Sequence, residues 1–144
     1  MRHSKDRLKD VRILVVEDDH DSREIVQFVL EQSGAAVMAV EGYAEAIEAY
    51  HQIEPNVLVA DIAMPDYNGY ALIARIREED KELGRVTPAI ALTAYTSDAD
   101  KKTALAAGFQ EYMSKPFQPG QLITKIVRLV RPAAGPHGKL SSAA

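Results

Sequence analysis

The sequence contains no cysteine, which excludes a disulfide framework, a cysteine-ligated zinc site and a thiol nucleophile. Long apolar runs are absent as well, and none approaches the roughly 20 residues that a membrane-spanning helix needs. The first residues, 1–10, are mostly charged and contain no apolar segment of the kind found in secretion signals. We therefore expect a cytoplasmic protein without a membrane segment.

Positive charge is not in excess either. The chain has 17 lysine and arginine residues against 21 aspartate and glutamate residues, for a net charge of −4. Because sequence-independent nucleic-acid binding needs a basic surface, we predict no direct contact with nucleic acid. Basic residues do gather near the N-terminus, where we interpret them as the charges of a solvated leader: Arg2, Lys5, Arg7, Lys9 and Arg12.

What the chain does contain is enough for one globular domain. With 144 residues, 47% of them hydrophobic, it can bury roughly two-thirds of its unfolded surface without a disulfide or a structural metal. We place this domain at residues 11–131, between the leader at 1–10 and a flexible tail at 132–144 that is rich in alanine, glycine, proline and serine.

Two kinds of segment alternate five times along the domain. Short apolar runs predict strands buried on both faces, and the amphipathic patterns between them predict helices. Strands that alternate with helices pair in parallel through right-handed crossovers. We therefore predict an α/β three-layer sandwich of the flavodoxin-like type, a five-stranded parallel sheet of order 2-1-3-4-5 with five helices. The expected strands are 13–16, 37–40, 57–60, 89–93 and 111–113.

Residues typical of helix ends mark several boundaries. Asp21 followed by Glu24 predicts a capping box at the start of the first helix. Gly34 predicts the end of that helix, and Gly108 the end of an alanine-rich helix at 100–107.

Polar side chains follow four of the predicted strands at the point where each strand ends. Open α/β sheets bind ligands at the carboxyl ends of their strands, near the switch in strand order, so we expect these side chains on one patch. Each alone has an ordinary interpretation as a turn, cap or surface residue, but their joint placement favours a functional site. In strand order they are Glu17, Asp18 and Asp19, then Asp61, Thr93 and Lys115.

The chemistry of this set points to phosphoryl transfer. Carboxylates that lie close together repel one another, and a bound cation relieves the conflict. Mg²⁺ prefers oxygen ligands and neutralises the charge of a phosphoryl group. A lysine and a hydroxyl can hold phosphoryl oxygens, and a carboxylate can act as the nucleophile and form an acyl phosphate.

The chain resembles the response-regulator receiver domains of two-component systems over residues 11–130. The resemblance rests on four motifs that occur in the order typical of that family. They are Ile13-Leu-Val-Val-Glu-Asp-Asp19, Asp61-Ile-Ala-Met-Pro65 with Asn68-Gly69, Ala91-Leu-Thr-Ala94, and Tyr112-Met-Ser-Lys-Pro-Phe117.

The resemblance implies a phosphoacceptor and a metal site. Asp61 matches the aspartate that takes the phosphoryl group. Glu17 and Asp18 match the acidic pair that holds Mg²⁺, with Asp61 and the backbone carbonyl of Ala63 as the remaining protein ligands.

It also implies residues that carry the signal away from the site. Thr93 matches the switch hydroxyl, Lys115 the lysine that pairs with the phosphoryl group, and Tyr112 the switch aromatic. The Lys115–Pro116 bond is expected to be cis. Gly69 is expected to occupy a turn that requires a positive φ.

The function that the resemblance implies is a signalling switch rather than a metabolic enzyme. The donor would be a histidine kinase or a histidine phosphotransfer protein, and the switched surface would be formed by the fourth helix, the fifth strand and the fifth helix. A monomer or a weak phosphorylation-dependent dimer is expected. Residues 88–95 and 104–110 are most similar to receivers of hybrid sensor histidine kinases, so a free-standing regulator and a receiver from a larger protein both stay open.

The same residues bear on three other interpretations. A flavodoxin-like cofactor binder needs a phosphate-cradling loop after the first strand, where this chain has acidic residues. A haloacid-dehalogenase-type phosphatase needs an aspartate where Ala63 stands. A phosphorylation-independent interaction module is the main alternative. Such modules usually lack one of the five site residues of the family, whereas this chain keeps all five: Glu17, Asp18, Asp61, Thr93 and Lys115. Since Ala63 cannot position a water molecule and Tyr95 is bulky, we expect a fairly long-lived phosphoryl state.

Overall fold

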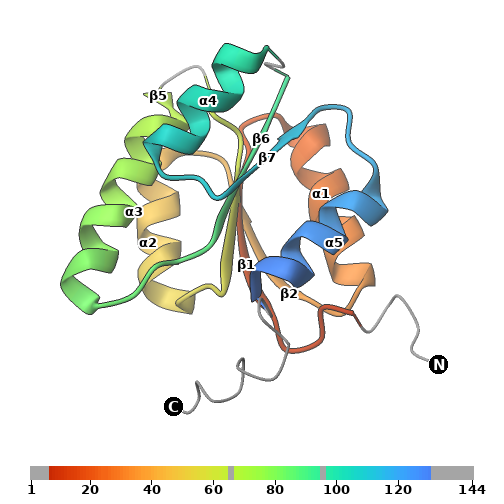
Figure 1. The fold of residues 1–144 in the computed structure, drawn as a ribbon. Coiled ribbons are helices and arrows are strands. Elements are labelled where there is room, and N and C mark those ends of the chain that lie inside the picture. The colour runs from red at the N-terminus through yellow and green to blue at the C-terminus, as the bar shows by residue number, and fades with distance from the viewer. Residues whose placement is uncertain (1–6, 65–66, 95–96, 131–144) are drawn as a thin grey trace, which may run out of the picture.

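The computed structural model describes residues 7–64, 67–94 and 97–130, which form a three-layer α/β sandwich (Figure 1). The middle layer is a five-stranded parallel sheet of order β2-β1-β3-β6-β7. This order confirms the predicted fold class, and each predicted strand is present to within one residue at either end. The strands are β1 (Arg12–Val16), β2 (Ala36–Val40), β3 (Val57–Ala60), β6 (Ala89–Thr93) and β7 (Glu111–Ser114).

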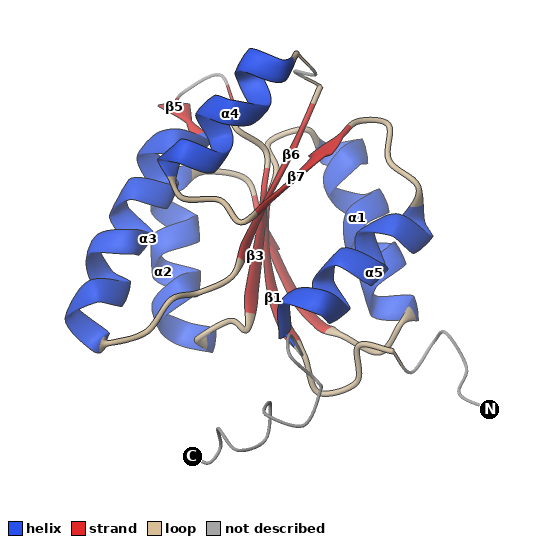
Figure 2. Ribbon diagram, viewed as in Figure 1, coloured by secondary structure: helices blue, strands red, loops and turns tan. Residues whose placement is uncertain are grey.

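Helices cover both faces of the sheet, and within the described ranges they number five, as predicted (Figure 2). One face carries α1 (His20–Gln32) and α5 (Pro119–Val130). The opposite face carries α2 (Tyr43–Ile53), α3 (Gly69–Leu83) and α4 (Asp98–Ala107). None of these helices is long and apolar enough to cross a membrane.

The unbroken apolar runs of the strands follow from this double cover. Successive side chains of a strand point to opposite faces of the sheet. In β1, Leu14 and Val16 pack into the core beneath α2 and α3, whereas Ile13 and Val15 pack into the core beneath α1 and α5. Both sets are buried, so the strand shows no polar alternation.

The packed domain begins earlier than the sequence suggested. Leu8, which falls in the predicted leader at 1–10, is fully buried in the core on the α1 and α5 side. Its N–H donates to the carbonyl of Ser33 at 2.8 Å. Residues 7–10 therefore belong to the fold, because one apolar side chain within a charged segment is enough to fix it. The rest of the predicted leader, 1–6, and the tail at 132–144 lie outside the described residues.

Two helix ends match the prediction and one start does not. Gly34 follows α1 with a φ of 99°, and Gly108 caps α4 with a φ of 127°. The predicted capping box at Asp21 is wrong, because α1 begins at His20 and its N-cap is Asp19, whose side chain accepts from the N–H of Ser22 at 2.8 Å. Asp19 offers the same short carboxylate acceptor and stands directly after the turn that leaves β1.

A small hairpin was not predicted. The strands β4 (Ala63–Met64) and β5 (Tyr67–Asn68) pair antiparallel between β3 and α3. Two-residue strands are too short to produce a periodic pattern in the sequence.

Candidate functional site

The carboxyl ends of four neighbouring strands bring the predicted residues together. Glu17 follows β1, Asp61 follows β3, Thr93 ends β6 and Lys115 lies just after β7. These strands are adjacent in the sheet and parallel, so their ends meet at one edge. The site therefore lies at the switch in strand order, where α/β sheets bind ligands.

Three carboxylates form the acidic part of the site. Glu17, Asp18 and Asp61 each bring an oxygen within 4.8 Å of the others. Glu17 and Asp61 are only 2% and 7% exposed. The N–H of Asp19 donates to Glu17 Oε2 at 3.0 Å, which fixes the orientation of that carboxylate.

Lys115 is the cation that contacts two of these carboxylates. Its Nζ donates to Glu17 Oε1 at 2.5 Å and to Asp61 Oδ2 at 3.1 Å. The backbone N–H of Lys115 donates to the carbonyl of Thr93 at 2.8 Å, and the Lys115–Pro116 peptide bond is cis. The lysine is thus held both by the sheet and by the acidic side chains.

The electrostatics of the site oppose a full negative charge on Glu17. Burial raises the pKa of Glu17 above its ordinary value, and the hydrogen bond from Lys115 only partly offsets this. Burial lowers the pKa of Lys115, but its hydrogen bonds to Glu17 and Asp61 outweigh burial, and the net pKa is raised. A second cation would therefore bind favourably beside these carboxylates.

This donor set fits Mg²⁺. The three carboxylates offer hard oxygen ligands, and one ammonium group leaves part of their charge unbalanced. Mg²⁺ usually takes one or two carboxylates and completes its shell with water or phosphate oxygens. Ala63, whose carbonyl is the fourth predicted protein ligand, is the first residue of β4.

Thr93 and Tyr112 lie on the β6 and β7 side of the site. Thr93 is fully buried at the end of β6. Tyr112 packs against the core beneath α2 and α3, and its hydroxyl is buried without a hydrogen-bond partner among the described residues. Burial raises the pKa of Tyr112, and Asp100 of α4 adds to the effect. Tyr112 therefore stays neutral, and its hydroxyl is available for a new partner.

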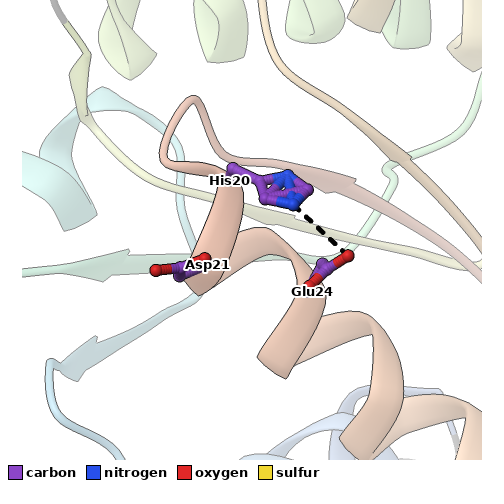
Figure 3. Close-up of side chains that lie close together, drawn as sticks. All are labelled: His20, Asp21 and Glu24. Carbon is purple, nitrogen blue, oxygen red and sulfur yellow. Dashed lines mark ion pairs between the residues drawn. The ribbon is translucent and has the colours of Figure 1, made fainter.

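A second group of potential ligands occurs at the start of α1. His20, Asp21 and Glu24 lie close together there, and His20 Nε2 lies 3.3 Å from Glu24 Oε2 (Figure 3). The side chains of His20 and Glu24 are 66% and 68% exposed. We interpret this group as part of the solvated surface of the helix, since all three residues are exposed.

Comparison with known proteins decides the family. The family model described as the response regulator receiver domain matches residues 13–127. The chain belongs to this family.

Several relatives of this receiver domain are similar over most of the chain. An uncharacterised 14.6 kDa protein of Leptolyngbya boryana is 44% identical over 116 residues, covering 81% of this chain and 87% of that protein. The transcriptional regulatory proteins TrcR of Mycobacterium tuberculosis and PhoB of Escherichia coli are 35% and 34% identical. The matches cover 84% and 83% of this chain but 46% and 52% of those proteins, so the chain spans about half their length.

Solved receiver domains share its fold. The Francisella response regulator 1452 receiver domain superimposes with a TM-score of 0.77 at 26% identity, covering 85% of this chain and 98% of that one. The BeF3-activated DrrB receiver domain gives a TM-score of 0.73 at 29% identity, covering 84% and 97%.

The prediction that Gly69 is needed for a positive φ was wrong. Gly69 is not among the glycines with positive φ, and it begins α3. A Cβ on Gly69 would lie 2.8 Å from Ile62 Cα and 2.9 Å from the carbonyl oxygen of Asp61. Glycine is needed because α3 starts in close contact with the backbone of the predicted phosphoacceptor. Tyr95, whose bulk led us to expect a long-lived phosphoryl state, lies outside the described residues.

Sequence reasoning also missed a residue that supports the acidic loop. Arg23 of α1 donates from NH1 to the carbonyl of Glu17 at 2.9 Å and to that of Asp18 at 3.3 Å. Its spacing from the acidic residues, about one and a half helical turns after them, was the available signal. An arginine on an exposed helix is too common for that signal to stand out.

Proposed function

We propose that this receiver domain takes a phosphoryl group on Asp61 from the phosphohistidine of a histidine kinase or a histidine phosphotransfer protein, in a Mg²⁺-dependent reaction. The observation that carries this proposal is the contact of Lys115 with both Glu17 and Asp61 in a group of three converging carboxylates. Such a group has no evident structural purpose, since buried like charges destabilise a fold.

Glu17, Asp18 and Asp61 would hold the metal, together with the carbonyl of Ala63. When bound, Mg²⁺ offsets the negative charge of the phosphoryl oxygens and of the carboxylates around them. The burial of Glu17 and Asp61 supports this role, because ligands that are already desolvated lose little hydration on binding.

Asp61 would act as the nucleophile. One of its carboxylate oxygens attacks phosphorus while the phosphorus–nitrogen bond of phosphohistidine breaks. The donor histidine keeps the electron pair of that bond and, with a proton on its other ring nitrogen, leaves as a neutral imidazole. The product is an acyl phosphate on Asp61. Lys115 is already within 3.1 Å of Asp61 and would pair with a phosphoryl oxygen there.

Thr93 and Tyr112 would transmit the change. A phosphoryl group adds acceptor oxygens, and the hydroxyl of Thr93 at the end of β6 would donate to one of them. Tyr112 would then repack beside α4, so that the face formed by α4, β7 and α5 differs between the two states. The hydroxyl of Tyr112 is buried with no hydrogen-bond partner among the described residues. This supports the proposal that the Tyr112 side chain adopts a second position when the site is phosphorylated.

The surface beside the site suits a protein donor. Ile25 and Phe28 of α1 are 56% and 62% exposed and lie about one turn apart. A hollow of about 450 Å³ joins this part of α1 to Lys115, Pro116 and Phe117. An apolar helix surface of the donor could pack here and bring its phosphohistidine toward Asp61. The proposal places the protein in the cytoplasm, where such donors act.

The test is the intact mass of the protein after incubation with acetyl phosphate, with and without Mg²⁺, for the wild type and Asp61→Asn. We expect one phosphoryl adduct that requires Mg²⁺ and is absent from the variant. No adduct under any condition would refute the proposal and favour the interaction module that works without phosphorylation.

A further inference from the structure

Among residues 97–130, the side-chain hydrogen bonds that link α4 to another element lie at its C-terminal end. Ala104 is its only buried side chain among the described residues, so the helix has little apolar contact to fix it. Its first turn is closed by a capping box between Ser97 and Asp100, which is local to the helix. Within the part of the chain that the structure describes, side-chain hydrogen bonds from another element reach α4 at its other end, where the chain turns at Gly108 into β7.

Arg77 of α3 supplies these hydrogen bonds. Its Nε and NH2 donate to the carbonyl of Gly108 at 3.1 and 2.7 Å, and NH2 also donates to Gln110 Oε1 at 3.1 Å. The side chain lies so close to Gly108 that a Cβ there would approach it to 3.3 Å. The guanidinium group thus binds the carbonyl that ends α4 and the residue that precedes β7.

Arg77 is itself fixed from the core. Its NH1 donates to Asp80 Oδ2 at 2.8 Å and to the carbonyl of Thr87 at 2.8 Å. Asp80 is only 2% exposed and also accepts hydrogen bonds from the N–H of Thr87 at 2.7 Å and from the hydroxyl of Tyr50. We call Arg77, with its hydrogen bonds to Gly108 and Gln110, the anchor. Through Asp80 it is joined to α2, α3 and the loop before β6, so its side chain has little freedom to move.

The anchor also reaches the two strands that carry site residues. Gln110 Oε1, besides contacting Arg77, accepts from the N–H of Ala89 at 2.7 Å, and the N–H of Gln110 donates to the carbonyl of Ala89 at 2.9 Å. Ala89 begins β6, which ends at Thr93, and Gln110 precedes β7, which leads to Lys115. Arg77 is thus linked through Gln110 to the starts of both strands, without touching the site.

We propose that Arg77 is a positioning residue that fixes the C-terminal end of α4 and the start of β7, so that α4 turns about Gly108 when the site is phosphorylated instead of moving as a whole. This inference rests on the proposed function for its trigger, but the anchor itself does not depend on phosphorylation. Arg77 and Asp80 belong to none of the site motifs, and nothing in the sequence around them marks this role.

Amide hydrogen exchange of the full chain, followed by NMR, tests the inference. The exchange is measured with Mg²⁺ alone and with Mg²⁺ plus beryllium fluoride, a phosphoryl-group analogue, in the wild type, Arg77→Lys and the control Arg75→Gln. Arg75 lies on the same helix but pairs with Glu79 on the surface. Arg77→Lys keeps a positive charge beside Asp80 and loses the forked donor to Gly108.

In the wild type we expect beryllium fluoride to change the exchange rates of amides in the first half of α4. The amides of Phe109 and Gln110 should keep their protection. In Arg77→Lys the protection of Phe109 and Gln110 should fall about tenfold even with Mg²⁺ alone, and the analogue should now perturb all of α4. Arg75→Gln should match the wild type. If Arg77→Lys does not fold, Arg77→Gln also removes the forked donor to Gly108 and keeps a shorter amide donor, and it should show the same loss at Phe109 and Gln110.

Unchanged protection in Arg77→Lys, or in Arg77→Gln where that variant is needed, would overturn the anchor. If beryllium fluoride changed the exchange of Phe109 and Gln110 in the wild type as much as that of the start of α4, it would contradict the proposed turn of α4 about Gly108. Failure of the proposed function has a different result: the wild type would form no phosphoryl adduct and its amide exchange would not respond to beryllium fluoride. The comparison of wild type and Arg77→Lys with Mg²⁺ alone would still test the anchor.

Discussion

At the scale of single residues, the environment of Asp61 is set on two sides. Its side chain meets Lys115 at 3.1 Å, and its carbonyl lies where a side chain on Gly69 would have to go. The contact with Lys115 is electrostatic, whereas the contact with Gly69 is steric. A change at either position should therefore affect phosphorylation for a different physical reason.

Gly69→Ala should impair both stability and phosphorylation. The new Cβ would meet backbone atoms of Ile62 and Asp61, which cannot rotate away as a flexible side chain could. We expect a loss of about 1–3 kcal/mol in the free energy of unfolding by urea and a slower reaction with acetyl phosphate. Gly120→Ala in α5 is the control, since nothing lies within 4 Å of its added Cβ. Equal behaviour of the two variants would contradict the close-contact explanation.

Asp80→Asn should reveal a pH-dependent contribution to stability. Burial alone would raise the pKa of Asp80, but the hydrogen bonds from Thr87 and Tyr50 outweigh burial, so the pKa lies below the ordinary 3.8. A lowered folded-state pKa means that the stabilisation is fully present above the unfolded-state value and is lost as the pH falls through the folded-state value.

We therefore expect the wild type to exceed Asp80→Asn by about 2–3 kcal/mol at pH 7 and pH 5, with the difference shrinking below about pH 4. Urea unfolding at each pH measures this difference. A constant difference down to pH 3 would show that Asp80 acts through shape or hydrogen bonding alone.

Asp61 and Asp80 illustrate what single residues reveal in a sequence. Asp61 directly follows an apolar strand and heads a recognisable motif, so its position could be predicted. Asp80 lies in the charged run 77–82 of a helix, where most carboxylates are exposed, and only the fold shows that it is buried. The reason for Gly69 was missed for the same cause, since its contact is with residues whose backbone path the sequence does not specify.

At the scale of elements, α1 presents the most notable surface. Ile25 and Phe28 are large apolar side chains that the fold leaves exposed, and Ile25 also lines the hollow that contains Lys115. Acidic residues of the same helix lie beside them, including Asp21, Glu24 and Glu31. A donor helix with an apolar stripe and basic flanks would match this surface.

Phe28→Ala should separate docking from chemistry. We expect phosphotransfer from a cognate protein donor to slow by about tenfold or more, because the variant loses an apolar contact of the interface. The reaction with acetyl phosphate should stay within about twofold of the wild type. Leu83→Ala, which removes another exposed apolar side chain at the end of α3, should leave both rates unchanged. Equal slowing by Leu83→Ala would remove the case for α1 as the docking surface.

Long elements were predicted better than short ones. The five strands of the sheet and the helices between them follow from apolar runs and helical periodicity, which persist over many residues. Periodicity did not predict the hairpin of β4 and β5 or the start of α1. Both the two-residue pairing and the choice between Asp19 and Asp21 as N-cap depend on how the chain leaves the preceding strand. The predicted strand order needed topological rules in addition to periodicity.

At the scale of the whole molecule, the acidic site should link Mg²⁺ to folding. A metal that binds the folded chain but not the unfolded one stabilises it by mass action, by about 2.7 kcal/mol at a concentration 100 times its dissociation constant. Thermal unfolding followed by circular dichroism should therefore shift upward with MgCl₂ and return with a chelator. Asp18→Asn should lose most of the shift. An equal shift in that variant would indicate that Mg²⁺ acts elsewhere on the surface.

The measurement that tests the central claim most directly is the chemical location of the phosphoryl group. The protein is incubated with acetyl phosphate and Mg²⁺, the acyl phosphate is reduced with borohydride, which converts the modified aspartate to homoserine, and the site is read by tandem mass spectrometry. The account predicts homoserine at Asp61 and at no other carboxylate. Homoserine at Asp18 or Asp19, with Asp61 unmodified, would contradict it.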